Sequence, residues 1–356
     1  MSVTNTELEL EERKEGKDLY SYQKGAIDKI FTAFEESPKD YHLLYQLPTG
    51  GGKTVIFSEI VRQYLKHHKK KVLVMTHRIE LCKQTSNMLT EFGVHNKVVD
   101  SKADLSDQAD YSCFVAMVET LNNRLNDDKL DISDIGLVII DEAHYNSFTK
   151  LFKFFSQSFI LGVTATPLSS SIELPMTDNY DELIVGESIE SLIENGFLAR
   201  AEMFTYNVGL TSLVVGANGD YTVKSSEDLY TDNDMLSKLL QAYEERSKDK
   251  KTLIFNNGIN TSLHVYDTFR RAGYPVAHLD NTNTKKERAL ILQWFKKTPG
   301  AILTSVSILT TGFDEPTVES IILNRATKSL TLYYQMIGRG SRILKDKKSF
   351  TVVDLG

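Results

Sequence analysis

The stretch YQLPTGGGKTVIFSEIVRQYL, residues 45–65, decides the fold. It joins the end of an apolar run to a glycine-rich turn and then to a segment with apolar residues at helical spacing. This order of strand, loop and helix is the context that a phosphate-binding loop requires. Main-chain N–H groups of such a turn point at phosphate oxygens, and the dipole of the following helix favours negative charge. We therefore expect a phosphate-binding loop in QLPTGGGKT, residues 46–54.

Within this loop the glycines permit the turn, and the side chains after them supply the chemistry. Lys53 is expected to reach the β- and γ-phosphate oxygens of a nucleotide, and Thr54 to place its hydroxyl on Mg²⁺. Leu47 stands where the strict pattern has its first glycine, and a glycine-rich surface loop is the alternative for the segment alone. The loop residues predicted to bind the nucleotide are Thr49, Gly50, Gly51, Gly52, Lys53 and Thr54.

Outward from the loop, short β-rich runs alternate with helix-period segments up to about residue 165 and again from about residue 251. That alternation predicts an α/β fold with mainly parallel sheets covered by helices, and a chain of 356 residues fits two such cores. The less regular stretch 167–233 is expected to hold a connection and a small hairpin. The predicted organisation is a charged N-terminal segment at 1–17, a first domain at 18–200, a connection at 201–233 and a second domain at 234–356.

A second chemical pattern is LVIIDEAH, residues 137–144, in which an apolar run ends in two carboxylates. A carboxylate at the carboxyl end of a strand is suited to hold Mg²⁺ beside a bound nucleotide. We expect Asp141 to be this metal ligand. Glu142 is predicted to position and deprotonate the attacking water. Taken alone, His144 would be read as a structural histidine.

GKT at 52–54, DEAH at 141–144, TATP at 164–167 and QMIGRGSR at 335–342, in this order, resemble the motifs of superfamily 2 helicases. The resemblance runs from about Leu19 to the end of the chain. Its phrases are most similar to RadD-like DNA repair helicases, with XPB-like enzymes and motor subunits of restriction enzymes as relatives. It implies two tandem RecA-like domains that hydrolyse ATP between them, with Mg²⁺, and move along nucleic acid.

The resemblance assigns residues that hold the adenine. SYQKGAI, residues 21–27, resembles the element ahead of the phosphate loop, so Gln23 is expected to read the adenine edge. Tyr20 or Tyr22 is expected to pack on the base. Tyr20 replaces the arginine that is usual in the family, which leaves the stacking partner open between the two tyrosines.

In the second half, the resemblance assigns the groups that complete hydrolysis. The segment LTTGFDEP, residues 309–316, is expected to touch the nucleotide ribose and a strand phosphate. The arginines of QMIGRGSR, residues 335–342, are spaced to share one helical face and are expected to act as arginine fingers. The nucleotide-side residues of this half are Gly312, Asp314, Arg339 and Arg342.

Residues at the open ends of the first strands are expected to hold a nucleic-acid backbone without reading bases. The segments 76–78 and 117–120 match these contact elements in the resemblance. The predicted nucleic-acid contacts are Thr76, His77, Arg78, Gln84, Thr120 and Thr311. A threonine pair that ends a strand is usually structural, but the resemblance assigns it to coupling. The predicted coupling residues are His144, Thr164, Thr166 and Gln335.

Composition leaves several alternatives open. The net charge of −7 argues mildly against a protein that coats nucleic acid, although a motor needs only a local positive track. The resemblance favours DNA over RNA and movement in the 3′-to-5′ direction, by a monomer. The alternatives are a duplex DNA translocase that does not separate strands, an RNA helicase, and a nucleotide-gated binding module with little turnover.

The remaining features bound the location of the protein and its metals. The N-terminus has no apolar signal-peptide core and no apolar run is long enough to span a bilayer, so a cytoplasmic protein is expected. Cys82 and Cys113 are too few for a zinc module and are expected to be buried thiols. The chain ends at Gly356, where RadD-like relatives continue into a cysteine-rich segment, so we expect a truncated chain or a minimal two-domain motor.

Overall fold

The computed structural model divides the chain into two compact units, one of Met1–Pro48 with Gly52–Ser188 and the other of Thr49–Gly51 with Ile189–Gly356. No helix in the part of the chain that the structure describes is long and apolar enough to cross a membrane. The charged segment 1–17 lies outside that part. The described residues are 18–38, 40–103, 106–126, 131–168, 175–217, 219–306, 309 and 313–356.

The first unit contains a seven-stranded sheet in the order β3-β4-β2-β5-β6-β1-β7, in which every pairing is parallel. β5 (Ile135–Asp141) shows why these runs form strands. All its residues are buried, and all except the last, Asp141, are apolar. A strand covered on both faces needs such a continuous apolar run. The strands are β1 (His42–Gln46), β2 (Lys71–Thr76), β3 (Asn96–Val99), β4 (Cys113–Met117), β5 (Ile135–Asp141), β6 (Phe159–Thr164) and β7 (Glu182–Val185).

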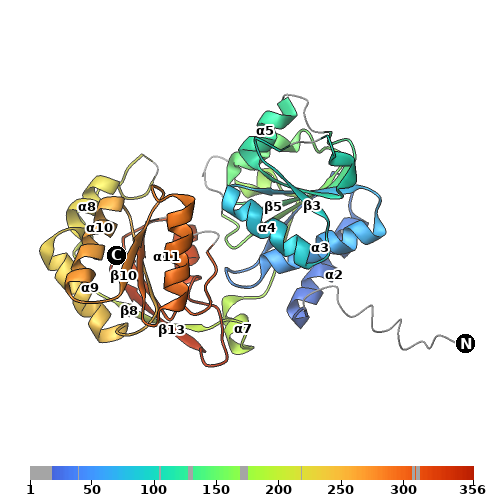
Figure 1. Cartoon of the computed structure of the whole chain (residues 1–356). Helices are drawn as coiled ribbons and strands as arrows, with labels where there is room; N and C mark the ends of the chain where they lie inside the picture. Colours follow the sequence, from blue (N-terminus) through green and yellow to red (C-terminus); the bar gives the residue numbers. More distant parts are fainter. Residues whose placement is uncertain are drawn as a thin grey trace, which may run out of the picture. The chain divides into compact units, whose positions relative to one another are not determined.

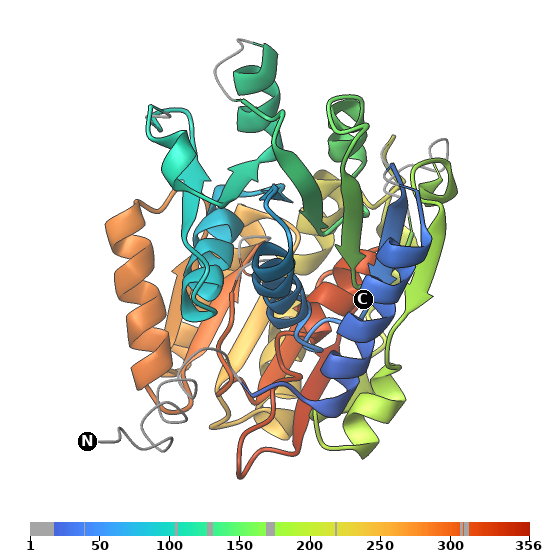
Figure 2. The same cartoon turned by 90° about the vertical axis from the view of Figure 1, so that its right-hand side faces the viewer.

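Helices cover both faces of this sheet. α2 contacts α3, and α3 contacts α4, so that the three helices lie side by side (Figures 1 and 2). α5 and α6 pack with the opposite face, where Leu121 and Leu151 join a cluster that includes Val138 and Ile140. The helices of this unit are α2 (Ser21–Glu36), α3 (Lys53–His67), α4 (Ile79–Glu91), α5 (Val118–Asn126) and α6 (Thr149–Phe152), with single turns η2 (Gln108–Asp110), η3 (Asn146–Phe148) and η4 (Met176–Asp178).

The second unit repeats the design with a six-stranded parallel sheet in the order β10-β11-β9-β12-β13-β8. Leu239 of α9 and Phe269 of α10 pack on one face, and Phe295 of α11 and Met336 of α12 on the other. Its elements are α7 (Ile189–Glu194), β8 (Arg200–Thr205), η5 (Leu210–Ser212), α8 (Val223–Tyr230), α9 (Asn233–Arg246), β9 (Thr252–Asn256), α10 (Ile259–Arg271), β10 (Val276–Leu279), α11 (Lys285–Lys297), β11 (Ile302–Ser305), β12 (Ser320–Asn324), α12 (Leu330–Ile337) and β13 (Ser349–Asp354).

The prediction of two mainly parallel sheets covered by helices is confirmed. The stretch 167–233 contains more structure than the expected connection, since β7 joins the first sheet and β8 the second. Both are edge strands with several exposed residues, so they lack the apolar run of a buried strand. An antiparallel bridge between Val215 and Tyr221 forms the small hairpin. The domain limits themselves stay a prediction.

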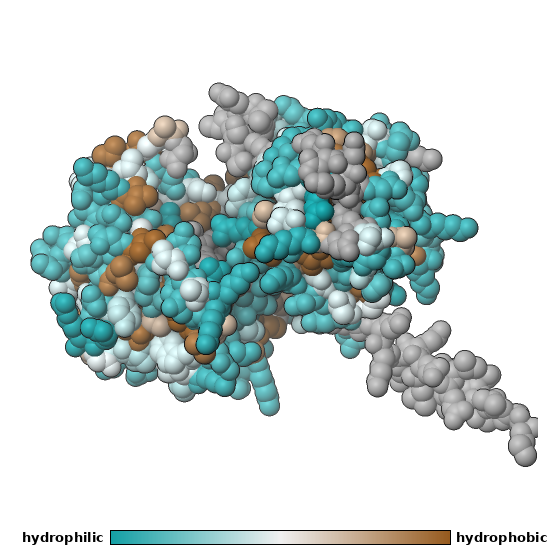
Figure 3. Space-filling model, turned by 45° about the horizontal axis from the view of Figure 1, so that its top comes forward, coloured by the Kyte–Doolittle hydropathy of each residue, from teal (hydrophilic) through white to brown (hydrophobic). Residues whose placement is uncertain are grey.

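On the face shown in Figure 3, brown apolar patches are small and separated by hydrophilic side chains. The cysteines are free and buried, as expected. Exposed aliphatic side chains of the second unit include Met203, Leu210, Val214, Val215, Val223 and Leu263.

Truncation of a buried side chain in the second sheet should therefore destabilise its unit. Ile254, which is 0% exposed in β9, packs with residues of α9 and α10. Ile254→Ala should lower the free energy of unfolding by about 2–5 kcal/mol, because it removes buried methyl groups and leaves a cavity. The matched control is Leu263→Ala on α10, where the side chain is 43% exposed and the expected change is within about 0.5 kcal/mol. Equal effects in urea unfolding would contradict this account of the core.

Candidate functional site

The sheet of the first unit brings the predicted residues to one edge. All its strands run parallel, so the carboxyl ends of β1, β6, β5, β2 and β4 follow one another along the same edge. The phosphate loop follows β1, and Thr164 and Asp141 end the next two strands. Thr76 ends β2, and Thr120 lies in the first turn of the helix after β4. Nucleotide-side and nucleic-acid-side predictions thus occupy adjacent parts of one edge.

The phosphate loop has the backbone that its glycines were expected to permit. Gly50 and Gly52 have φ values of 90° and 87°, in the left-handed region that other residues rarely adopt. Gly52 caps the N-terminus of α3, and Lys53 and Thr54 are the first two residues of that helix. The Lys53 Nζ donates a hydrogen bond to the Leu47 carbonyl at 3.2 Å, across the loop. The loop therefore presents helix N–H groups and an ammonium on the same side.

Gln23 lies against this loop. A Cβ atom on Gly52 would be 2.6 Å from the Gln23 Nε2, so a glycine is needed there for the amide to approach. The Gln23 Oε1 accepts a hydrogen bond from the Tyr20 N–H at 3.0 Å, which ties the amide to the start of α2. The Tyr20 and Tyr22 rings stack with centroids 5.9 Å apart, and Tyr20 is 47% exposed. The structure thus brings an amide and an exposed aromatic ring beside the phosphate loop.

Asp141 and Glu142 occupy the end of β5 under unusual constraints. Asp141 is 6% exposed, and burial, reinforced by the negative charge of Glu142, raises its pKa to about 7. The Lys53 ammonium opposes this rise. Glu142 has φ of 55°, which is uncommon for a residue with a side chain and is often found at functional sites. The backbone strain holds a second carboxylate next to the first.

His144 connects these carboxylates to the end of β6. Its Nδ1 lies 3.0 Å from the Thr164 Oγ1 and 3.5 Å from the Glu142 Oε2. The Thr164 hydroxyl donates to the Thr166 carbonyl at 2.9 Å, so the histidine must donate from Nδ1 and leave Nε2 as an acceptor. Burial lowers the pKa of His144, which favours this neutral form. The predicted coupling residues of the first unit form one network.

Two polar atoms of this network are buried without a hydrogen-bond partner among the residues that the structure describes. They are the Glu142 Oε2 and the His144 Nε2. Buried polar atoms are normally paired, and each exception calls for an explanation. Their position beside the phosphate loop fits groups that bind an external partner. In the second unit, the Gln335 Nε2 is also buried, and it has no hydrogen-bond partner among the residues that the structure describes.

The predicted nucleic-acid contacts differ in exposure. Thr76 is buried, and its hydroxyl donates to the Arg78 carbonyl at 3.0 Å and lies 3.0 Å from the Cys82 Sγ, so it orders the turn before α4. Arg78 is the N-cap residue of α4, and Gln84 is exposed on that helix. Thr120 is half-buried in α5.

His77 and Tyr145 form a contact that the sequence did not reveal. The His77 ring centroid is 4.2 Å from that of Tyr145, which is 4.3 Å from the centroid of His144. The rings of His77, Tyr145 and His144 therefore form a row of contacts that links a predicted nucleic-acid contact, His77, to His144 of the candidate site. Burial lowers the pKa of His77 to about 4, so its ring is neutral at pH 7. No sequence pattern links residues so far apart in the chain.

In the second unit the predicted arginines follow α12 instead of lying on it. The expectation of one helical face was wrong, because α12 ends at Ile337 and Gly338 caps it. Gly340 then lets the turn pack on the ring of Phe350, which a Cβ atom would strike. Gln335 is the member of this group that lies on the helix, where it is 3% exposed.

Both arginines bind the segment that precedes β12. The Arg339 Nη1 donates to the Phe313 carbonyl at 2.5 Å, and the Arg342 Nε donates to the Asp314 Oδ1 at 2.8 Å. The structure therefore brings Arg339, Arg342 and Asp314 together. Thr311 and Gly312, predicted to contact nucleic acid and nucleotide, lie outside the described residues.

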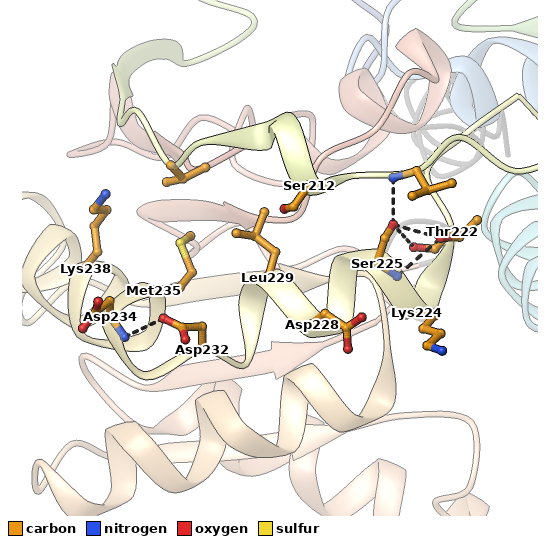
Figure 4. Close-up of a pocket in the computed structure, with 12 residues that line it drawn as sticks. Ser212, Thr222, Lys224, Ser225, Asp228, Leu229, Asp232, Asp234, Met235 and Lys238 are labelled. Carbon is orange, nitrogen blue, oxygen red and sulfur yellow. Dashed lines mark hydrogen bonds between the residues drawn. The ribbon is translucent and has the colours of Figure 1, made fainter.

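A separate cavity of about 650 Å³ lies on the second unit, between η5 and helices α8 and α9 (Figure 4). At its rim Ser225 and Thr222 hydrogen-bond to each other at the start of α8. None of its lining residues belongs to the predicted site, so this cavity is distinct from the groups described above.

The residues of the first unit fit a nucleoside triphosphate and its divalent cation. The helix N-terminus with Lys53 provides donors for phosphate, and Thr54 with the buried Asp141 provides oxygen atoms for a cation. Among the described residues no group of three or more His, Cys, Asp or Glu side chains could hold a metal ion by itself. Such a donor set suits Mg²⁺, which usually takes one or two carboxylates and completes its shell with phosphates and water.

Comparison with known families agrees with this geometry. Residues 16–169 match the family described as the res subunit of type III restriction enzymes. Residues 232–344 match the helicase conserved C-terminal domain. The two matches cover the two units in turn and include all four motifs quoted above.

Curated relatives include a Saccharomyces cerevisiae protein named as an ATP-dependent helicase, IRC3, which is 28% identical over 94% of this chain and 51% of its own length. A type I restriction enzyme EcoAI endonuclease subunit of Escherichia coli is 25% identical over 95% of this chain and 46% of its own length. The chain therefore spans about half the length of these relatives.

A solved fragment of an HsdR subunit of a type I restriction enzyme from Vibrio vulnificus has the same fold. It superposes with a TM-score of 0.71 at 22% identity, covering 94% of this chain and 63% of that one.

The neutral state of His77 should make stability depend on pH. Its pKa falls from 6.5 to about 4 on folding, so below pH 6.5 the unfolded chain binds a proton that the folded chain does not. Stability is full above pH 6.5 and is lost as the pH falls towards 4. His77→Phe keeps a ring against Tyr145 but cannot titrate. The fall in the free energy of unfolding between pH 7.5 and pH 5 should therefore be about 2 kcal/mol smaller in this variant than in the parent protein. Identical losses in denaturant titrations of the two proteins would contradict the assignment.

Proposed function

Because the chain belongs to superfamily 2 of the helicases, we propose that it hydrolyses ATP in response to nucleic acid and uses the cycle to move along a strand and separate duplexes. Helicase and restriction-enzyme family matches over both units support an ATP-dependent enzyme. The observation that carries the proposal is the edge of the first sheet, where a phosphate loop, a buried carboxylate and a strained Glu142 lie together.

Binding of ATP is proposed to use the loop and the start of α2. The Gln23 amide supplies a donor and an acceptor for the adenine edge, and Tyr20, which is exposed, is the better placed ring to pack on the base. The Lys53 ammonium places a positive charge on the phosphates. Thr54 and Asp141 would hold Mg²⁺, which neutralises phosphate charge when bound. The other phosphate-loop contacts are those of Thr49, Gly50, Gly51 and Gly52.

Hydrolysis is proposed to begin with a water held by Glu142. The Glu142 Oε2 lacks a hydrogen-bond partner among the described residues, so it is available to accept a water proton. The His144 ring is held by Thr164 through its Nδ1, which also lies 3.5 Å from the Glu142 Oε2, and its Nε2 remains an acceptor. A change at Glu142 would thereby be felt at the end of β6, which is our proposal for coupling by His144, Thr164 and Thr166. Gln335 is proposed to take part from the second unit.

The second unit is proposed to complete the reaction. Arg339 and Arg342 carry guanidinium groups that can neutralise charge developing on the transferring phosphoryl group, while Asp314 and Gly312 meet the ribose. Both arginines are held by acceptors that an anion can replace. Catalysis would then need groups from both domains, for which we propose the limits 18–200 and 234–356.

Nucleic acid is proposed to lie along the edge formed by the ends of β2 and β4. Helix N-termini and polar side chains there can hold phosphates without reading bases. We propose DNA as the ligand because relatives named as restriction-enzyme subunits match this chain. The proposed contacts are Thr76, His77, Arg78, Gln84, Thr120 and Thr311. A role in DNA repair, kinship with RadD-like and XPB-like helicases, a monomeric state and a cytoplasmic location stay predictions.

A duplex DNA translocase that does not separate strands is the second candidate. The similarity to a type I restriction enzyme subunit favours it. Displacement of a labelled strand from a fork reports separation, whereas displacement of a third strand from a triplex reports movement alone.

The function is tested by ATP turnover measured with single-stranded DNA, duplex DNA, forked DNA and RNA, with Lys53→Ala as the inactive reference. Stimulation by one polymer identifies the substrate class. Turnover that no polymer stimulates, or that persists in Lys53→Ala, would show the proposal to be wrong.

Glu142→Gln should separate binding from hydrolysis. The amide keeps the shape of the side chain and leaves the phosphate loop intact, but it cannot accept a proton. The variant should bind ATP with Mg²⁺ about as tightly as the parent and release phosphate at least about 100-fold more slowly. Glu202→Gln on the exposed face of β8 is the matched control and should be unchanged. Loss of ATP binding in Glu142→Gln would mean that the residue is structural.

Arg342→Ala should act on turnover more than on ATP affinity. A guanidinium that acts at the transition state is worth on the order of 10³–10⁵ in rate. Arg342→Lys should restore little, because a point charge does not replace the planar fork of donors. Arg271→Ala at the exposed end of α10 serves as control. A turnover within threefold of the parent protein would remove Arg342 from the reaction.

A further inference from the structure

Lys347 is buried, although it stands in a polar run with other lysines. Lys347 is 8% exposed, whereas Lys345 and Lys348 in the same run are exposed. Burial lowers the pKa of Lys347 to about 8, with Arg342 adding to the effect and the carboxylates of Glu319 and Glu315 opposing it. An amine removed from water is costly unless it is hydrogen-bonded, so its contacts must offset this cost.

Those contacts are main-chain carbonyls of two different segments. The Lys347 Nζ donates to the Gly340 carbonyl at 2.7 Å and to the Pro316 carbonyl at 3.1 Å. The backbone of Lys347 is itself fixed, because it exchanges two hydrogen bonds with Leu344 in a tight turn. The ammonium therefore joins a firmly held turn to two carbonyls.

The two segments are those that carry the proposed hydrolytic groups of the second unit. Gly340 lies between Arg339 and Arg342, and Pro316 follows Asp314 by two residues. The arginines also cross between these segments, through the Phe313 carbonyl and the Asp314 carboxylate. Those two bonds must be exchanged if the guanidinium groups are to reach a phosphate. The two hydrogen bonds that the Lys347 ammonium donates can stay in place during that exchange.

We propose that Lys347 is a positioning residue for Arg339 and Arg342, whose ammonium keeps the backbone of the arginine turn registered on the 313–316 segment while the guanidinium groups bind the transferring phosphate. Lys347 touches no reacting atom and acts through the two arginines. The inference rests on the proposed function of those arginines. It adds a residue that neither the motifs nor the family matches assign, since the second match ends at residue 344.

The test compares Lys347→Met, which keeps the length of the side chain and loses all its donors, with Lys348→Met at the neighbouring exposed position. In Lys347→Met, kcat for ATP should fall about 10- to 100-fold with KM changed less than about threefold, because small displacements of catalytic groups have effects of this size. Lys348→Met should keep the parent values. Lys347→Arg, which retains charge and donors, should recover part of kcat.

A double-mutant cycle separates positioning from general support of the fold. If Lys347 acts through the two arginines, Lys347→Met should lower kcat by less than about threefold in an Arg339→Ala/Arg342→Ala background, because both groups that it positions are gone. The same factor in both backgrounds would overturn the proposal.

Hydrogen exchange measured on the same proteins does not depend on any activity. In Lys347→Met, peptides covering 313–318 and 336–343 should exchange faster, while those of β9 and β12 stay protected. Unchanged exchange in the two segments would overturn the proposal even if ATP turnover were absent from the parent protein. If Lys347→Met does not fold, the comparison is made between Lys347→Arg and Lys347→Gln, and equal kcat in these two would count against a charged tether.

Discussion

Parallel pairing of the strands is the constraint on which the candidate site depends. A parallel neighbour can be reached only by a crossover, so each strand must end at the same edge as the others. In the first unit this places the phosphate loop, Thr164 and Asp141 in adjacent positions after β1, β6 and β5, although long stretches of chain separate them. The apolar runs that form the buried strands therefore do more than build a core. They determine which polar residues become neighbours.

That edge concentrates features that disfavour folding. Asp141 is a carboxylate held almost out of water, Glu142 has a left-handed backbone, and His144 keeps a buried nitrogen without a partner among the described residues. Strain and unsatisfied polarity of this kind persist only where the surrounding packing fixes them. Here the packing is supplied by β5 and β6, whose apolar residues, apart from the half-buried Phe159, are buried. Binding of a polyanion with a cation would relieve several of these costs together.

The fold could be predicted from sequence because its information is local. A strand ending at Asp141 was predicted, since a continuous apolar run that ends in carboxylates has few alternatives, and β5 is that strand. The turn at Gly338 was not predicted, because spacing suggested a longer helix and the packing of Gly340 on Phe350 decided otherwise. Edge strands β7 and β8 have too many exposed residues to give an apolar pattern.

The limits of sequence reasoning at the site have a similar cause. Nothing in the run KDKK distinguishes Lys347 from its neighbours, because burial there is set by carbonyls contributed from Pro316 and Gly340. The contact between His77 and Tyr145 likewise depends on which strands are adjacent in the sheet. Residue types and motifs identified the carboxylates and arginines, whereas the groups that hold them required coordinates.

The hydrogen bonds that hold the turn with Arg339 and Arg342 differ in whether their acceptor belongs to the backbone or to a side chain. Arg339 binds the carbonyl of Phe313, and Lys347 binds that of Pro316. Every amino acid offers a carbonyl, so exchange of the acceptor residue is neutral wherever the backbone path is kept. Arg342 instead binds the side chain of Asp314, and loss of that carboxylate removes the bond. A substitution at Phe313 or Pro316 that keeps the backbone path therefore leaves these bonds intact, whereas a substitution at Asp314 removes the carboxylate that Arg342 binds.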